Sequence, residues 1–217
     1  DNCQIPVVGL GTWKSEPGKT TSQAVLDSLE AGYRHIDTAR AYDNETDVGR
    51  AVNDSGLPRG ELFITTKLWN QHQGYEEAIE ACEKSLNRLN CDYIDLYLIH
   101  WPLREKRNHS WKAFIELRER GLCKSIGVSN FTIEHLAEIE AKFGILPAVN
   151  QVEFHPYHYQ KELLDYCNSK NIIIEAYSPL VHAKRMDEPK LGAISEELGK
   201  TPAQILIRWS IQRGMVV

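Results

Sequence analysis

Apolar and polar positions follow two different periods along the chain. Short runs rich in β-branched and aromatic residues predict strands, and stretches with apolar residues three or four positions apart predict helices between them. The predicted strands cover residues 7–11, 33–37, 62–67, 93–99, 125–129, 148–153 and 172–177, with an eighth beginning at Met215. The clearest helical stripes are Tyr75, Ile79, Cys82, Leu86 and Leu89, and Ile133, Leu136, Ile139 and Phe143.

Helix ends carry their own signals. Thr201-Pro202-Ala203-Gln204 supplies an N-cap, a proline at the first helical position and a glutamine three residues after the cap. Glycine is favoured just past a helix because it adopts the left-handed conformation there. The stripe that includes Phe143 is therefore expected to end at Gly144. Other helices are expected to stop at Gly32, Gly56 and Gly121.

The strand ends recur at a steady interval. Asp37, Lys67, His100 and Ser129 are spaced by about 30 residues, the length of one strand-helix unit. Such alternation predicts an α/β protein with a parallel sheet and one domain over residues 1–217. An open doubly wound sheet would prefer a G-x-G-x-x-G turn after the first strand, and Lys14 breaks that pattern. A (β/α)8 TIM barrel is therefore favoured.

The length of the sequence bears on the eighth strand. The chain stops at Val217, three residues into that predicted strand, whereas a barrel of this kind takes about 250 residues. We therefore expect the rest of the eighth strand, a last helix and a tail to be absent from this sequence.

The composition limits the classes of molecule that the protein is expected to bind. Of the 217 residues, 42% are hydrophobic, and a net charge of −5 argues against nucleic acid or an acidic membrane as the main partner. The five cysteines include no C-x-x-C pair and indicate reduced thiols in a cytoplasmic protein. Neither a bilayer-spanning run nor a charged and apolar leader is present. We expect a cytoplasmic monomer.

Four chemically active side chains lie at or just after three successive strands: Asp37, Tyr42, Lys67 and His100. In a barrel these strand ends meet on one face, where active sites are built. A carbonyl that accepts hydride needs a proton on its oxygen, and the phenol of Tyr42 can supply it if Lys67 draws its pKa toward neutrality. Asp37 would keep Lys67 charged. His100 would donate a hydrogen bond to the carbonyl oxygen.

Each of these residues also has a structural interpretation. Asp37 could cap a helix, Tyr42 could anchor a loop, Lys67 could be a surface charge and His100 a polar group at a strand end. Their recurrence at consecutive strand ends favours a joint chemical role. No pattern of cysteine and histidine has the spacing of a metal site.

Six motifs together resemble the aldo-keto reductase superfamily: GYRHIDTARAYDNE, FITTKLWN, DYIDLYLIHWP, IGVSNF, VNQVEFHP and EAYSPL. The resemblance covers essentially the whole chain and is closest to the bacterial and protozoan branch of small-aldehyde and diketone reductases, similar to 2,5-diketogluconate reductase and prostaglandin F synthase. It implies a (β/α)8 barrel that reduces small carbonyl compounds with NADPH, or less often NADH. It also implies that Asp37, Tyr42, Lys67 and His100 form the catalytic tetrad, with Tyr42 as the proton donor.

The resemblance further implies a cofactor site and a substrate pocket. Ser129, Asn130 and Gln151 match residues that hold the nicotinamide carboxamide, and Tyr177 matches the aromatic residue that stacks on its ring. Ser178 and Leu180 match contacts to the pyrophosphate, while Thr12 and Asp37 match contacts near the nicotinamide. Trp13, Trp69 and Trp101 match positions that line an apolar substrate pocket.

Several questions stay open at this stage. The family segment that grips the 2′-phosphate of NADPH lies past Val217, so neither the preference for NADPH over NADH nor the substrate can be predicted. Arg40 stands where the tetrad loop often has a small apolar residue. Two other functions remain possible: a Schiff-base aldolase that uses Lys67, or a nicotinamide-binding barrel without turnover.

Overall fold

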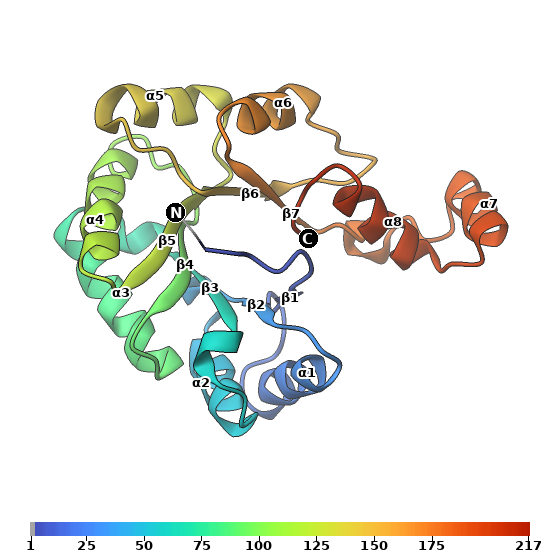
Figure 1. The fold of residues 1–217 in the computed structure, drawn as a ribbon, viewed down its shortest axis with the longest axis horizontal. Coiled ribbons are helices and arrows are strands. Elements are labelled where there is room, and N and C mark those ends of the chain that lie inside the picture. The colour runs from blue at the N-terminus through green and yellow to red at the C-terminus, as the bar shows by residue number, and fades with distance from the viewer. Residues whose placement is uncertain (1–2) are drawn as a thin grey trace.

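The computed structural model describes residues 3–217, in which seven parallel strands form one curled sheet with helices outside it (Figure 1). The strands are ordered along the sheet as they are in the sequence, as expected when each strand is followed by a helix that returns the chain to the same side. All seven predicted strands are confirmed. They are β1 Leu10–Gly11, β2 His35–Asp37, β3 Phe63–Leu68, β4 Ile94–Ile99, β5 Cys123–Ser129, β6 Val149–Glu153 and β7 Ile173–Tyr177.

Helices alternate with these strands, and most of them pack around the outside of the sheet (Figure 1). α7 lies farthest from the sheet, beside α8. Within residues 3–217 no helix combines the length and apolar character needed to cross a membrane. The α-helices are α1 Lys19–Glu30, α2 Glu45–Asp54, α3 Glu76–Leu89, α4 Arg107–Glu119, α5 Ile133–Phe143, α6 Lys161–Ser169, α7 Pro189–Leu198 and α8 Pro202–Ile211. Short 3-10 turns are η1 Arg40–Tyr42, η2 Arg59–Glu61, η3 Asn70–His72 and η4 Val181–Ala183.

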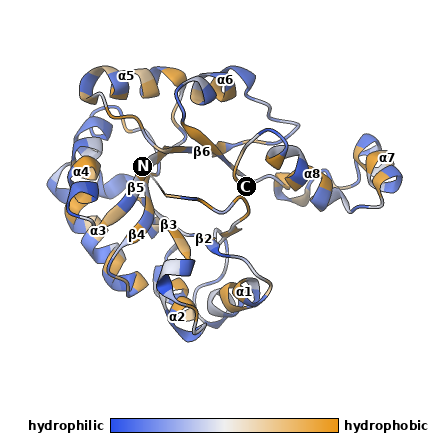
Figure 2. Ribbon diagram, viewed as in Figure 1, coloured by the Kyte–Doolittle hydropathy of each residue, from blue (hydrophilic) through white to orange (hydrophobic). Residues whose placement is uncertain are grey.

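The main core lies between the sheet and the surrounding helices. Every residue of β3 and β4 is buried, because a parallel strand covered on both faces has no solvent side. On the helix side, Tyr97 stacks on Phe114 with ring centroids 4.5 Å apart. Hydrophobic residues are frequent in the strands and form stripes along the helices, whose other faces are hydrophilic (Figure 2).

The inside of the sheet is narrow at β5. A Cβ atom at Gly127 would come within 2.7 Å of both the Leu98 side chain and the Val149 carbonyl oxygen. Neighbouring strands can therefore approach here only because position 127 has no side chain.

The predicted helix ends are confirmed. The backbone N–H of Gln204 donates to Thr201 Oγ1 at 3.3 Å, and the N–H of Thr201 donates to Gln204 Oε1 at 3.0 Å, which forms the expected capping box. Gly144 ends α5 with a φ of 63°. Glycines of positive φ also follow α1, α2 and α4, at Gly32, Gly56 and Gly121.

Residues 216–217 lie where an eighth barrel strand would run. On one side, the N–H of Val216 donates to the Ile174 carbonyl at 3.0 Å, and the N–H of Ala176 donates to the Val216 carbonyl at 2.8 Å. On the other side, Val217 bonds through its backbone to Val7 and Gly9 at 2.9 and 2.8 Å. Both edges of the seven-stranded sheet are thus bonded to the same short segment. This arrangement is consistent with a (β/α)8 barrel.

Candidate active site

Asp37 and Lys67 form a buried ion pair at the carboxyl ends of two neighbouring strands. Asp37 is the last residue of β2 and Lys67 is the fifth residue of β3. The Lys67 ammonium donates to Asp37 Oδ1 at 2.5 Å and to the Thr38 carbonyl oxygen at 2.9 Å. The Lys67 side chain is fully buried, so Asp37 supplies the charge that it needs inside the protein.

Tyr42 and His100 complete the group. Tyr42 ends η1, directly after β2, and its ring centroid lies 5.1 Å from Lys67 Nζ. His100 follows β4 and meets the Tyr42 ring edge-on at 5.8 Å between centroids. The structure therefore brings together the four residues that the strand ends predicted.

The lysine keeps its charge. Burial acts to lower the pKa of Lys67, but the charges of Asp37 and Tyr42 and the hydrogen bond to Asp37 together raise the pKa above its ordinary value. An ammonium therefore lies beside Tyr42 at any physiological pH.

Lys67 acts on the pKa of Tyr42 in the expected direction, but the expectation that this pKa is drawn toward neutrality is wrong. Burial of the phenol raises its pKa, Lys67 lowers it, and Asp37 raises it again, so that the net direction is upward. The low dielectric around a buried phenol penalises the phenolate more than one nearby cation favours it. Tyr42 therefore carries its proton at neutral pH and can serve as a donor.

His100 is a neutral imidazole. Burial lowers its pKa to about 3, and the positive charge of Lys67 acts in the same direction. Trp69 packs edge-on against the ring, with centroids 5.2 Å apart. A neutral imidazole has one N–H donor and one acceptor, so His100 can donate a hydrogen bond without adding a positive charge.

The residues expected to hold a carboxamide lie at the end of β5 and in the middle of β6, and they are hydrogen-bonded to this group. The Ser129 hydroxyl and the Asn130 backbone N–H both donate to the Gln151 carbonyl oxygen at 2.9 Å. The Gln151 side-chain amide donates to Asp37 Oδ2 at 2.8 Å. The Asn130 amide donates to the His100 carbonyl oxygen at 3.1 Å. These amides are therefore held in place by the tetrad residues themselves.

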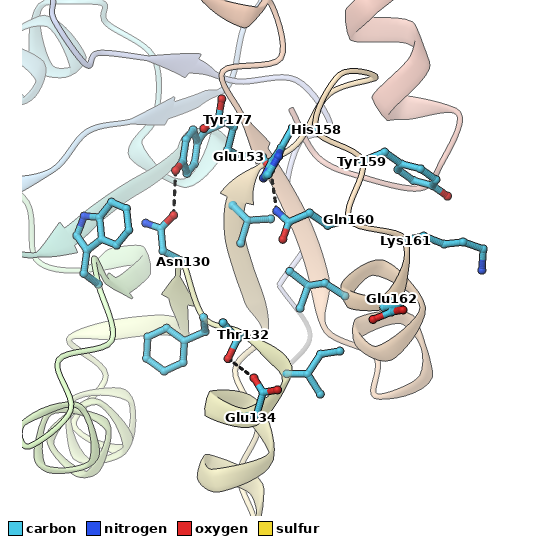
Figure 3. Close-up of a pocket in the computed structure, with 15 residues that line it drawn as sticks. Asn130, Thr132, Glu134, Glu153, His158, Tyr159, Gln160, Lys161, Glu162 and Tyr177 are labelled. Atoms are coloured by element: carbon cyan, nitrogen blue, oxygen red, sulfur yellow. Dashed lines mark hydrogen bonds between the residues drawn. The ribbon is translucent and has the colours of Figure 1, made fainter.

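Tyr177, at the end of β7, points toward Asn130. Its hydroxyl donates to Asn130 Oδ1 at 2.9 Å (Figure 3). Both residues, together with Trp101, line a cavity of about 730 Å³ that extends over the loops before α5 and α6. None of the four tetrad residues lines this cavity. It adjoins the expected carboxamide site at Asn130.

The other predicted residues lie either beside the tetrad or near the segment that follows β7. Trp69 contacts His100, whereas the ring of Trp13 packs against His182 with centroids 5.7 Å apart. Ser178 and Leu180 lie in the turn between β7 and η4, where Ser178 has a φ of 52° and its carbonyl accepts a hydrogen bond from Val181. The structure therefore places Trp13 beside the segment after β7, and Trp69 beside the tetrad.

Thr12 is tied to the tetrad through Asn44, a residue that sequence reasoning missed. The Thr12 backbone N–H donates to the Asp37 carbonyl at 2.9 Å. Asn44 is fully buried; its amide donates to the Thr12 carbonyl at 3.0 Å and its oxygen accepts from the Thr38 hydroxyl at 2.8 Å. Asn44 thus fixes the loop that carries Tyr42. The only signal in the sequence was its place in the polar run AYDNE after a strand end.

Glu45 and Glu175 were missed as well. Glu45 accepts hydrogen bonds from Thr66 at 2.7 Å and from Arg88 at 2.6 Å, and so anchors the start of α2 against β3 and α3. Glu175 is buried inside the sheet at 5% exposure. A carboxylate within the apolar run NIIIEAYSPL was the available signal.

Known proteins resemble this chain in sequence and structure. The model of the Aldo/keto reductase family matches residues 7–217. An aldo-keto reductase of Mycolicibacterium smegmatis is 51% identical over all of this chain and 79% of its own length. The glyoxal reductase of Bacillus subtilis is 47% identical over 98% of this chain and 77% of its own length. The crystal structure of a Bombyx mori aldo-keto reductase in complex with NADP superposes with a TM-score of 0.91, at 37% identity, over 98% of this chain and 78% of that one. The chain belongs to the aldo/keto reductase family.

Proposed function

We propose that this aldo-keto reductase uses NADPH to reduce aldehydes and small dicarbonyl compounds to alcohols, with Tyr42 as the proton donor. The observation that carries the proposal is the buried Asp37–Lys67 pair beside the protonated phenol of Tyr42 and the neutral His100.

The residues present fit a nicotinamide cofactor. A carboxamide needs both donors and acceptors, and the side chains of Asn130 and Gln151 offer both. The aromatic ring of Tyr177 lies directly beside Asn130. A relative of similar structure binds NADP. When bound, the cofactor would supply the hydride.

The protein's own residues would then handle the carbonyl oxygen. That oxygen gains negative charge as the carbon is reduced, and the Tyr42 phenol would transfer its proton to it. The Lys67 ammonium would stabilise the phenolate left on Tyr42, and Asp37 would hold the ammonium in place. The neutral His100 would donate a hydrogen bond to the same oxygen and orient the substrate.

The alternative functions fit the site less well. A Schiff-base lysine must be neutral to attack a carbonyl, and the raised pKa of Lys67 together with its ion pair to Asp37 keeps it charged. A barrel that only binds the cofactor would have no need for a proton donor, yet Tyr42 and its partners are gathered in one cluster.

Small dicarbonyl compounds are the proposed substrate class. A relative that is 47% identical is a glyoxal reductase. Trp69 packs on His100, and Trp101 flanks the cavity beside Asn130, so that two indoles would exclude water near the reacting oxygen. We also propose that the complete fold is a single-domain (β/α)8 barrel. A monomeric state, a cytoplasmic location and the choice of NADPH over NADH stay predictions.

The proposal is tested with purified protein, NADPH and methylglyoxal or glyoxal. The loss of NADPH absorbance should depend on the carbonyl compound and should match the alcohol formed mole for mole. Borohydride treatment with the carbonyl alone should leave no adduct on Lys67. An enzyme that forms a trapped Lys67 adduct, or that consumes no NADPH with any small aldehyde, would refute the proposed reaction.

A further inference from the structure

A second ionisable pair lies inside the sheet, adjacent to the tetrad. Glu175 on β7 and His35 on β2 are both buried, with His35 Nε2 3.9 Å from Glu175 Oε1. His35 Nε2 also lies 3.0 Å from the Thr65 hydroxyl. Within residues 3–217, neither His35 Nδ1 nor Glu175 Oε2 has a hydrogen-bond partner. The space for the imidazole depends on Gly9, where a Cβ atom would come within 2.6 Å of His35 Nδ1.

Sheet register connects Glu175 to the tetrad. Glu175 is paired with Gln151 on the neighbouring strand, and Gln151 donates to Asp37 Oδ2. The other carboxylate oxygen of Asp37 accepts from Lys67. Glu175 is therefore separated from the Asp37–Lys67 pair by a single side chain, the uncharged amide of Gln151.

The groups that face Glu175 disfavour a second negative charge. Burial and then the charge of Asp37 raise the pKa of Glu175 to about 8, although the charge of Lys67 and a side-chain hydrogen bond to Gln151 oppose this. Burial lowers the pKa of His35 to about 4, so that no imidazolium is present to hold the carboxylate. Tyr42 is the remaining titratable group in electrostatic contact with Glu175, through space. Near pH 7 the interior pair is therefore an uncharged acid and an uncharged imidazole.

We propose that Glu175 is a positioning residue that sets the proton-donating strength of Tyr42 through the field at the Asp37–Lys67 pair. As the neutral acid, Glu175 leaves the Lys67 ammonium opposed by Asp37 alone. As a carboxylate, it adds a second negative charge near that ammonium, and the phenolate left on Tyr42 after proton transfer becomes less stable. This inference rests on the proposed reduction.

The consequence is a fall in rate before Tyr42 itself ionises. As pH rises past the point where Glu175 loses its proton, reduction should slow because the donor has become a weaker acid. A second, complete loss should follow at higher pH, when the Tyr42 phenol is deprotonated. Without Glu175 only the second step should be seen, since Tyr42 alone then decides the basic side of the profile.

The test is the pH profile of kcat/KM for NADPH-dependent reduction of methylglyoxal, from about pH 6 to about pH 11. The wild-type enzyme should show a partial fall of about threefold to tenfold centred near pH 8, then complete loss. Glu175→Gln, which keeps the shape and removes the charge, should lack the first step, and Glu175→Asp should restore it. Glu153→Gln removes a partly exposed carboxylate at the end of the neighbouring β6 and should keep both steps.

A second readout needs no turnover. Infrared difference spectra of the cofactor-free protein should show a carboxylic acid band that disappears near pH 8 in the wild type and is missing from Glu175→Gln. A single-step rate profile in the wild type, or a Glu175 band that is already lost below about pH 6, would overturn the inference. Absence of NADPH oxidation by the wild type would overturn the proposed function instead, and the infrared titration would still decide where the Glu175 proton resides.

Discussion

Gln151 donates a hydrogen bond to Asp37 across 114 positions of sequence, with 2.8 Å between Nε2 and Oδ2. This bond joins the residues expected to hold the nicotinamide carboxamide to the buried ion pair that supports Tyr42. In the proposed function, cofactor binding and proton donation would therefore share one carboxylate, Asp37, whose other oxygen accepts a hydrogen bond from Lys67.

Replacing Gln151 should weaken both functions. In Gln151→Leu, Asp37 Oδ2 loses a donor and a bound carboxamide loses a polar partner, so we expect NADPH to bind about tenfold more weakly and kcat to fall. Quenching of tryptophan fluorescence measures the binding. Gln23→Leu, on the exposed face of α1, is the matched control and should change neither value. Normal NADPH affinity in Gln151→Leu would contradict the assignment.

Asn44 should matter to stability and to rate. Asn44→Ala leaves the buried Thr38 hydroxyl without its partner and removes one of the two donors to the Thr12 carbonyl, which should cost about 2–3 kcal/mol of the free energy of unfolding. The loop that carries Tyr42 should loosen, and kcat should fall while the affinity for NADPH changes less. Urea unfolding and steady-state kinetics measure the two effects. Asn53→Ala removes a half-buried bond within α2 and should cost under about 1 kcal/mol; equal losses in the two variants would count against this role.

Tyr177 should act through its ring. Tyr177→Phe removes the hydroxyl bond to Asn130 and frees that amide, so we expect NADPH to bind as tightly as before, or more tightly. Tyr177→Ala removes the aromatic surface and should weaken binding by about 1 kcal/mol or more. Titration calorimetry distinguishes the two variants. An equal loss in Tyr177→Phe and in Tyr177→Ala would show that the hydroxyl, and not the ring, contacts the cofactor.

Glu175 and His35 should change the pH dependence of the free energy of unfolding in opposite directions. The folded pKa of Glu175 is raised from 4.5 to about 8, so the folded state binds the extra proton and stability falls as pH rises between these values. The folded pKa of His35 is lowered from 6.5 to about 4, so its contribution is present above pH 6.5 and is lost as pH falls toward 4. Each slope should reach at most about 1.4 kcal/mol per pH unit.

Single variants separate these slopes. Relative to the wild type, Glu175→Gln should become progressively more stable from about pH 4.5 to about pH 8, and His35→Asn should lose less stability below about pH 6.5. Urea unfolding at fixed temperature across that range measures both. A stability difference between wild type and Glu175→Gln that does not vary with pH would mean that Glu175 is ionised like an exposed carboxylate.

Much of the site could be predicted because strand ends are visible in the sequence. Apolar runs end at Asp37, near Lys67 and before His100, and parallel strands must bring those ends to one face. What could not be predicted depends on contacts between distant segments. The bond from Tyr177 to Asn130 and the anchoring by Asn44 need the sheet register. The raised pKa of Tyr42 needs the extent of its burial, which a sequence does not state.

The most direct test of the account is the reduction of methylglyoxal by Tyr42→Phe, with NADPH binding measured on the same sample. We predict that kcat falls by about 10²-fold or more while the affinity for NADPH stays within about threefold of the wild type, because the ring remains and only the proton is lost. Tyr33→Phe, which removes a phenol at the opposite end of β2, should keep full activity. Full turnover by Tyr42→Phe would contradict the central claim that this phenol supplies the proton.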